Sequence, residues 1–467
     1  MCSKSSSQTP PTDGEEQLDE EIQPYLSEQF ASELGGGATA IPVHGSGKGE
    51  RREALEKRYK SRFSERPDYR QLVTYVPNKK IPVYNWFKFK EGFSRQLVAS
   101  LTKHMGVRKG AVIYDPFAGS GTTLLACKEL GFSGIGSDIL PVAVFVSGVK
   151  ITDWHDRQGL ALAVKEFLSI PYSTPSGSLP KIKIIDLAFP QEVQQQILFF
   201  KESAERFDQP VRDFLMLGLL TILEEVSRTS KDGQFLRLVE KRIPDVRETL
   251  ARTLNSMLAD LSSLLPEGGG FPGKAEVIHG DAREQCLDGR YHHKVQAVIT
   301  SPPYLNRYDY SRSYALELCL LNVKSHEDMV LVRHSLLRSH IESREHPHKS
   351  IELPALAEIL QRLRNRELNN QRIPTMINAY FEDMNMVISN LSLCLKTGGK
   401  VALVVANAQF AGENVPTDLM LCELASQHGF STEEIWITRY KGNSSQQMAV
   451  YGRRPVRESI VFWSKDA

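Results

Sequence analysis

Residues 111–140 constrain the fold more strongly than any other segment of this chain. The apolar run AVIY (111–114) leads into the turn DPFAGSG (115–121), and the helix after it carries leucines and ends at Gly131. A second short strand, within GIGSDIL, ends at Asp138. Two strands joined by one helix form a parallel pair with a right-handed crossover. The segment therefore predicts an α/β fold built on a parallel sheet.

The same sheet pattern returns later in the chain, after two interruptions. AEVIHGD ends at Asp281, VQAVIT runs into Ser301-Pro302-Pro303-Tyr304, and KVALVVAN is strongly apolar. EEIWITRY and ESIVFWSK predict an antiparallel pair at the end of the chain. We therefore expect one core built from residues 67–150, 274–320 and 376–467, with helical insertions at 151–273 and 321–375.

Residues 1–66 have the composition of a disordered tail and linker. Ser, Thr, Pro and Gly dominate the start, an acidic cluster follows, and such a segment cannot bury enough apolar surface to offset its ordering entropy. From Glu50 to Arg66 the charges suggest a solvated helix that serves as a linker. The segment GSGKGE resembles a phosphate-binding loop, but Pro42 and Gly49 occupy positions that such a loop needs for Gly and Ser or Thr.

The overall charge and composition limit the possible partners. Lys and Arg number 57 against 56 Asp and Glu, so any surface for nucleic acid must be local. None of the six cysteines forms a CxxC pair, and no apolar run is long enough for a bilayer, so we expect a soluble cytoplasmic protein without a membrane partner. We expect no metal and read five histidines of the second insertion as solvated loop residues: His326, His334, His340, His346 and His348.

Four polar signals fall at the ends of predicted strands. They are the turn DPFAGSG, Asp138, Asp281 and the SPPY loop. In an open α/β sheet the ligand binds outside the carboxyl ends of the strands, so these residues are expected to share one cleft. Each of the first three also has a structural interpretation: glycines for turn geometry, and Asp138 and Asp281 as caps of the segments that follow.

The SPPY loop is the most specific of the four signals. Two prolines after an apolar strand cannot extend the sheet and hold the backbone rigid. A carbonyl and the Ser301 hydroxyl can then accept hydrogen bonds from an exocyclic amino group, whose lone pair is otherwise delocalised into the base. Tyr304 can stack on a base that has left its helix. This chemistry suits amino methylation of a nucleobase.

The motifs DPFAGSG, GSDIL, HGDAR and SPPY, in this order, resemble the amino-methyltransferases of DNA, and SPPY in place of DPPY resembles the cytosine-N4 branch. The resemblance implies a Rossmann-like seven-stranded methyltransferase sheet, S-adenosylmethionine as cofactor, and transfer to cytosine N4 of a flipped base. It implies DNA as partner and allows a cognate restriction endonuclease. The implied catalytic residues are Ser301, Pro302, Pro303 and Tyr304. The implied cofactor residues are Asp115, Phe117, Gly119 and Gly121, Asp138 for the ribose, Asp281 for the adenine, and Phe93 in FKEGFS.

DNA contacts are expected from two basic segments. Arg307 and Tyr310 follow the SPPY loop, and the run after Arg439 is the most one-sidedly basic in the chain, although a solvated hairpin connection explains it equally well. The residues expected to contact DNA in that run are Arg439, Lys441, Asn443 and Arg457. Adenine-N6 methylation of DNA, guanine-N2 methylation of RNA and a non-catalytic binding module are the alternatives, and either insertion could read the target.

Overall fold

The computed structural model describes residues 49–466 apart from 233–234, 265–269, 285–288, 345–350 and 443–454. Within these ranges the strands form an eight-stranded sheet in the order β1-β11-β12-β8-β7-β2-β3-β6. The strands are β1 (Phe63–Glu65), β2 (Val112–Asp115), β3 (Ser133–Asp138), β6 (Lys274–His279), β7 (Val295–Thr300), β8 (Leu395–Ala406), β11 (Phe430–Lys441) and β12 (Val456–Lys465). The predicted α/β class is confirmed.

The sheet is parallel except at β12, which pairs antiparallel with both β11 and β8. This confirms the antiparallel pair expected at the end of the chain. β1 adds an eighth strand, parallel to β11, to the seven that the sequence predicts. The chain order reverses between β2 and β7, which are neighbours, so the carboxyl ends of these two strands mark the switch point where a ligand is expected.

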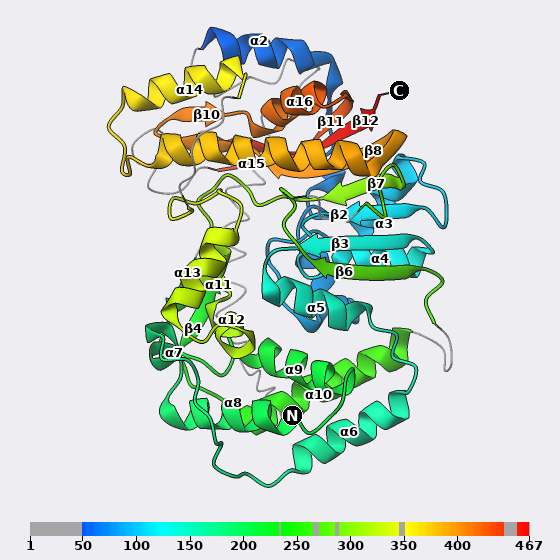
Figure 1. The fold of residues 1–467 in the computed structure, drawn as a ribbon, viewed down its shortest axis with the longest axis vertical. Helices are drawn as coiled ribbons and strands as arrows, with labels where there is room; N and C mark the ends of the chain where they lie inside the picture. Colours follow the sequence, from blue (N-terminus) through cyan, green and yellow to red (C-terminus); the bar gives the residue numbers. More distant parts are fainter. Residues whose placement is uncertain are drawn as a thin grey trace, which may run out of the picture. The chain divides into compact units, whose positions relative to one another are not determined.

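Alternation along the strands divides the core between the two faces of the sheet. Tyr114, Val298 and Leu403 pack on one face beneath α15, whereas Ile113 and Ile299 pack on the other face with α3. Figure 1 shows α15 crossing the sheet, with α2, α14 and α16 beyond it. The helices of the core are α2 (Glu50–Tyr59), α3 (Arg95–His104), α4 (Thr122–Leu130), α5 (Pro141–Ile151), α14 (Pro354–Arg364), α15 (Ile373–Cys394) and α16 (Thr417–Gln427).

Local sequence signals explain how two of these helices begin and end. The Ser94 hydroxyl accepts a hydrogen bond from the Leu97 amide at 3.2 Å and caps α3. Gly131 adopts a left-handed conformation at the end of α4, as predicted. Short 3-10 helices lie at Lys60–Arg62, Pro67–Tyr69, Val76–Lys80 and Tyr84–Trp86, and β9 (Ala408–Phe410) pairs with β10 (Glu413–Val415).

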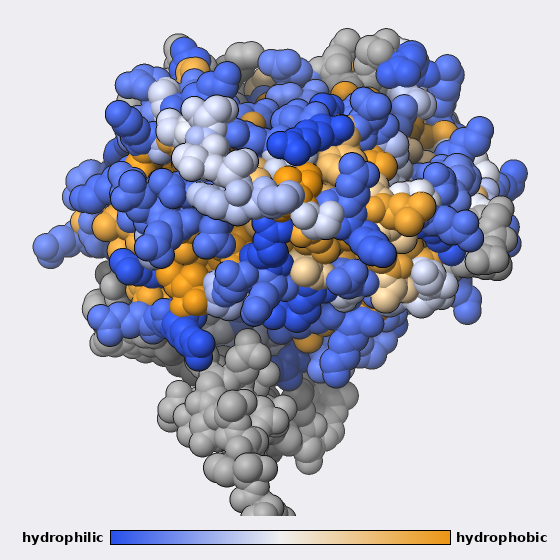
Figure 2. All heavy atoms as spheres, turned by 90° about the horizontal axis from the view of Figure 1, so that it is seen from below, coloured by the Kyte–Doolittle hydropathy of each residue, from blue (hydrophilic) through white to orange (hydrophobic). Residues whose placement is uncertain are grey.

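The first insertion is helical apart from one hairpin. It consists of α6 (Arg157–Ser169), α7 (Lys183–Ala188), α8 (Gln191–Ala204), α9 (Val211–Ile222), the strands β4 (Thr229–Asp232) and β5 (Phe235–Leu238), and α10 (Val246–Leu264). Figure 2 views the molecule from the side of this insertion, where hydrophilic side chains cover most of the surface and apolar ones form separate patches. After β7 come α11 (Tyr310–Ser313), α12 (Ala315–Leu321) and α13 (His326–Ser335).

The expectation of a solvated linker differs from the structure between residues 50 and 66. Arg52 in α2 is fully buried and forms ion pairs at 2.7 Å with Glu358 and Glu413, and β1 pairs with β11. These carboxylates lie about three hundred residues away in the sequence, so the local charge pattern does not reveal them. Residues 1–48 of the predicted tail lie outside the described residues. Across the described ranges, no helix is both long and apolar enough to cross a membrane.

Candidate active site

A pocket of about 890 Å³, including its open mouth, lies at the carboxyl ends of β2, β3, β6 and β7. Gly119 of the glycine turn and Ser301 of the SPPY loop both line it. The pocket is the cleft that the sequence predicts, and it brings together segments more than 180 residues apart. Its wall also includes these expected residues: Phe93, Asp115, Phe117, Asp138, Asp281, Pro303 and Tyr310.

The two glycines of the turn have different roles. Both have positive φ, +53° at Gly119 and +79° at Gly121. Gly119 lines the pocket, and a Cβ there would lie 3.1 Å from the Phe89 ring. A Cβ at Gly121 would lie 2.7 Å from the Cβ of Ser147 in α5, and Gly121 is not among the lining residues. Gly121 therefore permits close packing of α4 against α5, which differs from the expected cofactor contact.

Asp115 joins the glycine turn to the strand that precedes the SPPY loop. Its carboxylate accepts hydrogen bonds from the hydroxyls of Thr123 and Thr300, both at 2.6 Å, and from the Phe117 amide at 3.1 Å. Burial raises the pKa of Asp115 to about 6, against the opposing effect of these donors. Because Thr300 immediately precedes Ser301, one buried carboxylate fixes the distance between the two motifs.

Asp138 faces the pocket from the end of β3. Its carboxylate accepts hydrogen bonds from the Gly119 amide at 2.8 Å and from the Leu140 amide, just before α5, at 2.9 Å. Burial raises the pKa of Asp138 to about 6, although both amides favour its charged form. The Asp138 side chain thus orients the glycine turn. Each carboxylate oxygen accepts one of these two bonds and retains a second lone pair for a ligand.

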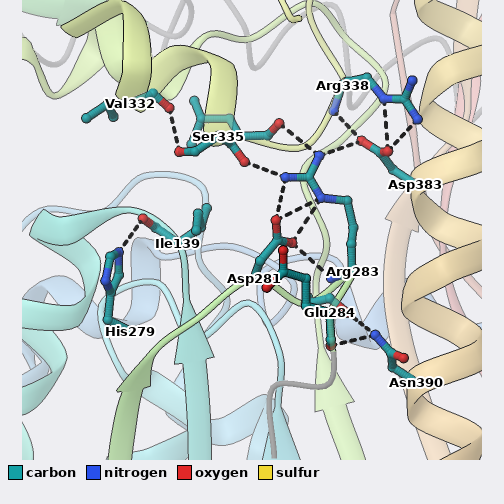
Figure 3. Close-up of polar contacts among 12 residues, drawn as sticks. Ile139, His279, Asp281, Arg283, Glu284, Val332, Ser335, Arg338, Asp383 and Asn390 are labelled. Carbon is teal, nitrogen blue, oxygen red and sulfur yellow. Dashed lines mark hydrogen bonds and ion pairs between the residues drawn. The ribbon is translucent and has the colours of Figure 1, made fainter. Parts of the chain in front are cut away.

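The opposite wall is held by Arg283, as Figure 3 shows. Its guanidinium forms an ion pair with Asp281 at 2.6 Å and a second with Asp383 of α15 at 3.1 Å. It also donates to the carbonyl oxygen of Ser335 at 2.6 Å, at the end of α13. Arg338 completes the cluster through a buried ion pair with Asp383 at 2.6 Å. Asp281 is therefore anchored by an arginine rather than capping a turn alone.

A glutamate near the C-terminus, Glu458, anchors the SPPY loop. The Tyr304 hydroxyl donates to the buried carboxylate of Glu458 in β12 at 3.0 Å. Glu458 also pairs with Arg439 and, at 2.6 Å, with Lys441, whose ammonium lies 5.1 Å from the centre of the Tyr304 ring. Burial alone would raise the pKa of Glu458, but Lys441 and Arg439 outweigh it and lower the pKa. Ser301 and Pro303 line the pocket, whereas Pro302 and Tyr304 are not lining residues.

Three of the residues expected to contact DNA are engaged by acidic side chains. Arg439 and Lys441 neutralise Glu458. Arg457 is nearly buried and pairs with Asp418 at 2.6 Å and Glu56 at 2.8 Å, which raises its pKa despite the opposing effect of burial. The expectation of a phosphate contact at Arg457 therefore differs from the structure, where the side chain stabilises the core. Asn443 lies outside the described residues.

Two predicted base-contacting residues follow the loop and differ in position. Tyr310 lines the pocket, and its ring lies edge to face with Tyr308 at 4.8 Å. Arg307 has a φ of +69° and donates its amide to the Ser339 carbonyl at 3.1 Å, but it is not among the lining residues. Only Tyr310 is placed to meet a ligand in the pocket.

Several wall residues were not expected from the sequence. Phe89 and Glu91 are not among them, because both belong to the segment FKEGFS, which resembles the cofactor-contacting motif of the family. Ser335 to Leu337 and Ser339 come from the second insertion and carry no recognisable motif. Their position depends on the Arg283 ion pairs, which only the folded chain reveals.

The charge of the pocket indicates the kind of ligand that fits. Asp115, Asp138, Asp281 and Glu91 contribute four carboxyl groups, and among the residues that the structure describes none in the lining is Lys, Arg or His. Such a wall disfavours a phosphate-bearing ligand and suits a cation that also carries hydroxyl groups and an aromatic base. S-adenosylmethionine, with its sulfonium and ammonium charges, ribose and adenine, has this chemistry.

The histidines expected on solvated loops differ from the structure in two ways. His326 and His334 are exposed, but they lie in α13 rather than in a loop. His340 is 2% exposed, and neither ring nitrogen has a hydrogen-bond partner in the part of the chain that the structure describes. His346 and His348 lie outside the described residues. No group of three or more His, Cys, Asp or Glu residues suited to a metal ion occurs within the described ranges.

Comparison with known proteins extends the similarity over most of the chain. A model of the DNA methylase family matches residues 50–145. The chain is 34% identical to the Type II methyltransferase M.BsoBI of Geobacillus stearothermophilus, covering 88% of this chain and 91% of that protein. It is 32% identical to the Type II methyltransferase M.AvaI of Nostoc sp., covering 88% and 93%.

A solved rRNA methyltransferase, AviRa from Streptomyces viridochromogenes, aligns with 12% identity, covers 79% of this chain and 85% of its own, and has a TM-score of 0.26. The two Type II methyltransferases are far more similar in sequence, over 88% of the chain. The chain therefore belongs to the S-adenosylmethionine-dependent DNA amino-methyltransferase family, to which the resemblance of its motifs had pointed.

Proposed function

We propose that this DNA methyltransferase transfers the methyl group to N4 of cytosine in a base flipped out of the duplex. The observation that carries the proposal is that Ser301 and Gly119 line one pocket, with a serine at the first position of the Pro-Pro-Tyr loop. The serine favours cytosine N4 over adenine N6, for which the family more often has aspartate. Membership of a DNA family favours DNA over RNA.

The cofactor is proposed to lie along the wall built by β2, β3 and β6. In this proposal Phe117, Gly119 and Phe93 contact its methionine end, Asp138 accepts hydrogen bonds from its ribose, and Asp281 accepts one from its adenine. Arg283 orients the Asp281 carboxylate through bonds to both of its oxygens, and Asp281 lines the pocket where the adenine is proposed to lie. When bound, S-adenosylmethionine supplies a methyl group that its sulfonium has already activated.

The protein's own task is to align the target amino group and to exclude water. A carbonyl of the loop and the Ser301 hydroxyl accept the two amino hydrogens, which draws the nitrogen towards tetrahedral geometry and exposes its lone pair. Positioning of this kind can contribute on the order of 7–11 kcal/mol. No covalent nucleophile is required, and none of the described cysteines lines the pocket.

The proposal also places the enzyme in the cytoplasm, where it acts on genomic DNA, together with a cognate restriction endonuclease that cuts the same site when it is unmethylated. Such a pairing agrees with the Type II names of the two relatives. Co-occurrence of a cleavage activity with the same sequence specificity in the source cells tests this part.

The base specificity can be tested directly. The purified chain is incubated with methyl-labelled S-adenosylmethionine and mixed-sequence DNA, the DNA is digested to nucleosides, and the labelled nucleoside is identified. We expect label in N4-methylcytosine; label in N6-methyladenine would overturn the proposal. Ser301→Ala should abolish most turnover, whereas Ser339→Ala, which removes a hydroxyl from the opposite wall of the same pocket, should retain it.

A further inference from the structure

The hairpin β4–β5 of the first insertion carries a concentration of positive charge. Between residues 228 and 242 the sequence has five basic and two acidic residues, in a chain whose net charge is only +1. Most of these cations reach solvent, and two further exposed lysines come from the segment that leads into the pocket wall. The exposed set is Lys88, Lys90, Arg228, Arg237, Lys241 and Arg242.

The hairpin is fixed directly behind the wall of the pocket. Lys231 of β4 is buried and forms an ion pair with Glu317 of α12 at 2.5 Å, and its ammonium lies 4.2 Å from the centre of the Tyr314 ring. Tyr314 stacks on Phe89, a lining residue, with centroids 5.0 Å apart and planes 11° apart. A chain of buried contacts therefore runs from the hairpin to the pocket.

A second link runs through the exposed side of the same wall. The ammonium of Lys90, which lies between the lining residues Phe89 and Glu91, donates to the backbone carbonyl of Lys231. β5 in turn contacts α11, the helix that begins at Tyr310. Figure 1 shows β4 beside α11 and α13. A ligand held on the hairpin thus lies beside the pocket in a fixed position.

The cations of this surface differ from the basic run near the C-terminus. There, Glu458, Asp418 and Glu56 neutralise the basic side chains. Here, Lys88 has only a long ion pair with Glu224 at 3.9 Å, Lys241 donates to the carbonyls of Glu224 and Thr229, and Arg228 and Arg242 form no ion pair with any residue in the described ranges. Partial burial, followed by the neighbouring Lys88, lowers the pKa of Lys90, although Glu224 and Glu91 oppose this shift.

We propose that the hairpin surface, made of Arg228, Arg237, Lys241 and Arg242 together with Lys88 and Lys90, binds phosphates of the target DNA beside the flipped base. The inference rests on the proposed function, because this surface would hold the DNA duplex from which the target base is flipped into the pocket. Phosphate contacts of this kind carry no sequence information and would set the position of the protein on the duplex.

The salt dependence of DNA binding tests this assignment. Each lost phosphate contact lowers the slope of log K against log salt by about 0.9, so Arg228→Gln/Arg242→Gln should lower it by about 1.8 and weaken binding to a fluorescent duplex of mixed sequence. Arg228→Lys/Arg242→Lys should keep the slope, because it keeps both charges. Affinity for S-adenosylmethionine should stay within twofold, roughly 0.4 kcal/mol.

The matched control is Arg108→Gln/Lys109→Gln. These exposed residues precede β2, at the end of the strand opposite the pocket, and their replacement removes the same charge. The proposal is supported if the hairpin variant has a smaller salt slope than the unmodified chain while the control variant keeps the slope of the unmodified chain. It is overturned if the hairpin variant and the control variant have the same slope. The measurement follows binding alone, so label appearing in adenine would defeat the cytosine proposal and leave this result intact.

Discussion

The turn after β2 and the loop after β7 lie side by side in one pocket, yet they are held in place in opposite ways. The carboxylates that hold the turn, Asp115 within it and Asp138 at the end of β3, receive hydrogen bonds from neutral hydroxyls and amides, and burial raises both pKa values to about 6. The carboxylate that anchors the loop, Glu458, lies between two cations that lower its pKa.

The difference separates two functions that the pocket must combine. Asp138 accepts two hydrogen bonds, both from neutral amides, so its charge and remaining lone pairs are available to a cationic ligand, in agreement with the cofactor contact proposed there. A carboxylate saturated by Arg439, Lys441 and the Tyr304 hydroxyl has little left for a ligand. Glu458 instead keeps the loop rigid, which suits positioning of the target base.

The largest effect is expected from Tyr304→Ala, which removes the anchored side chain of the loop. Misplacement of reacting groups by about 1 Å can cost about 10²-fold, so turnover should fall by about that factor. Affinity for S-adenosylmethionine should stay within about threefold, since Tyr304 is not among the lining residues. Steady-state kinetics and equilibrium binding of the same variant measure both. Equal losses in both quantities would contradict the division between turn and loop.

Asp138→Ala should produce the reverse pattern. The variant removes an acceptor proposed for the ribose and also frees the Gly119 amide that it orients. Loss of a hydrogen bond to a charged group costs about 1.5–3 kcal/mol, so cofactor affinity should fall about 10- to 100-fold. Turnover at saturating cofactor should change far less. Calorimetric titration with S-adenosylmethionine gives the affinity, and an unchanged value would remove Asp138 from the proposed site.

The turn and the loop also differ in how far the sequence predicts them. DPFAGSG and Asp138 lie within 24 residues of each other. An apolar strand followed by a glycine turn predicts which end of the strand faces a ligand. The SPPY loop is equally contiguous. Their meeting follows from the rule that parallel strands end at one edge of the sheet. The parallel sheet and many of the residues that line the pocket were therefore predictable.

The residues that hold these motifs were not predictable, because their partners are distant in the sequence. Tyr304 and Glu458 are 154 positions apart, and Arg283 meets carbonyls of residues more than 50 positions away. The run that includes Arg439 and Arg457 looked like a DNA-binding surface because its acidic partners belong to other elements. A basic residue is available to DNA only if folding leaves it without a carboxylate, and the sequence alone does not show this.

A change of pH should distinguish the two kinds of carboxylate. Asp138 has a raised pKa of about 6 in the free protein, and the cofactor favours its charged form. The contribution of the Asp138 carboxylate to cofactor binding is therefore present above pH 6 and is lost as pH falls through that value. Affinity should be about tenfold weaker at pH 5 than at pH 7. Titrations across this range measure it. In Asp138→Asn the dependence should vanish; if it persists, Asp115 is its source.

The same raised pKa values affect the stability of the free protein with a definite sign. An acid whose folded pKa exceeds its unfolded value binds protons more tightly in the native state, so its contribution to stability is complete at low pH and declines as pH rises towards about 6. Glu458, with its lowered pKa, contributes in the opposite direction: its stabilisation is present above the unfolded pKa and is lost on acidification. Turn and loop thus respond to acid with opposite signs.

The smallest effect is expected from Tyr304→Phe, which removes only the hydroxyl that donates to Glu458. The ring remains, and Arg439 and Lys441 still neutralise the carboxylate, so the loop loses one of several restraints. A change of about 0.5–1 kcal/mol in the positioning of the loop would lower turnover about two- to fivefold.

The chain offers a close control in Tyr440→Phe. This variant removes a tyrosine hydrogen bond to Glu65 at the edge of the sheet that has the same length, 3.0 Å, as the bond from Tyr304 to Glu458. Both variants should lose similar stability in thermal unfolding, but only Tyr304→Phe should lose turnover. A matching loss of turnover in both variants would mean that the Glu458 contact stabilises the fold without positioning the loop.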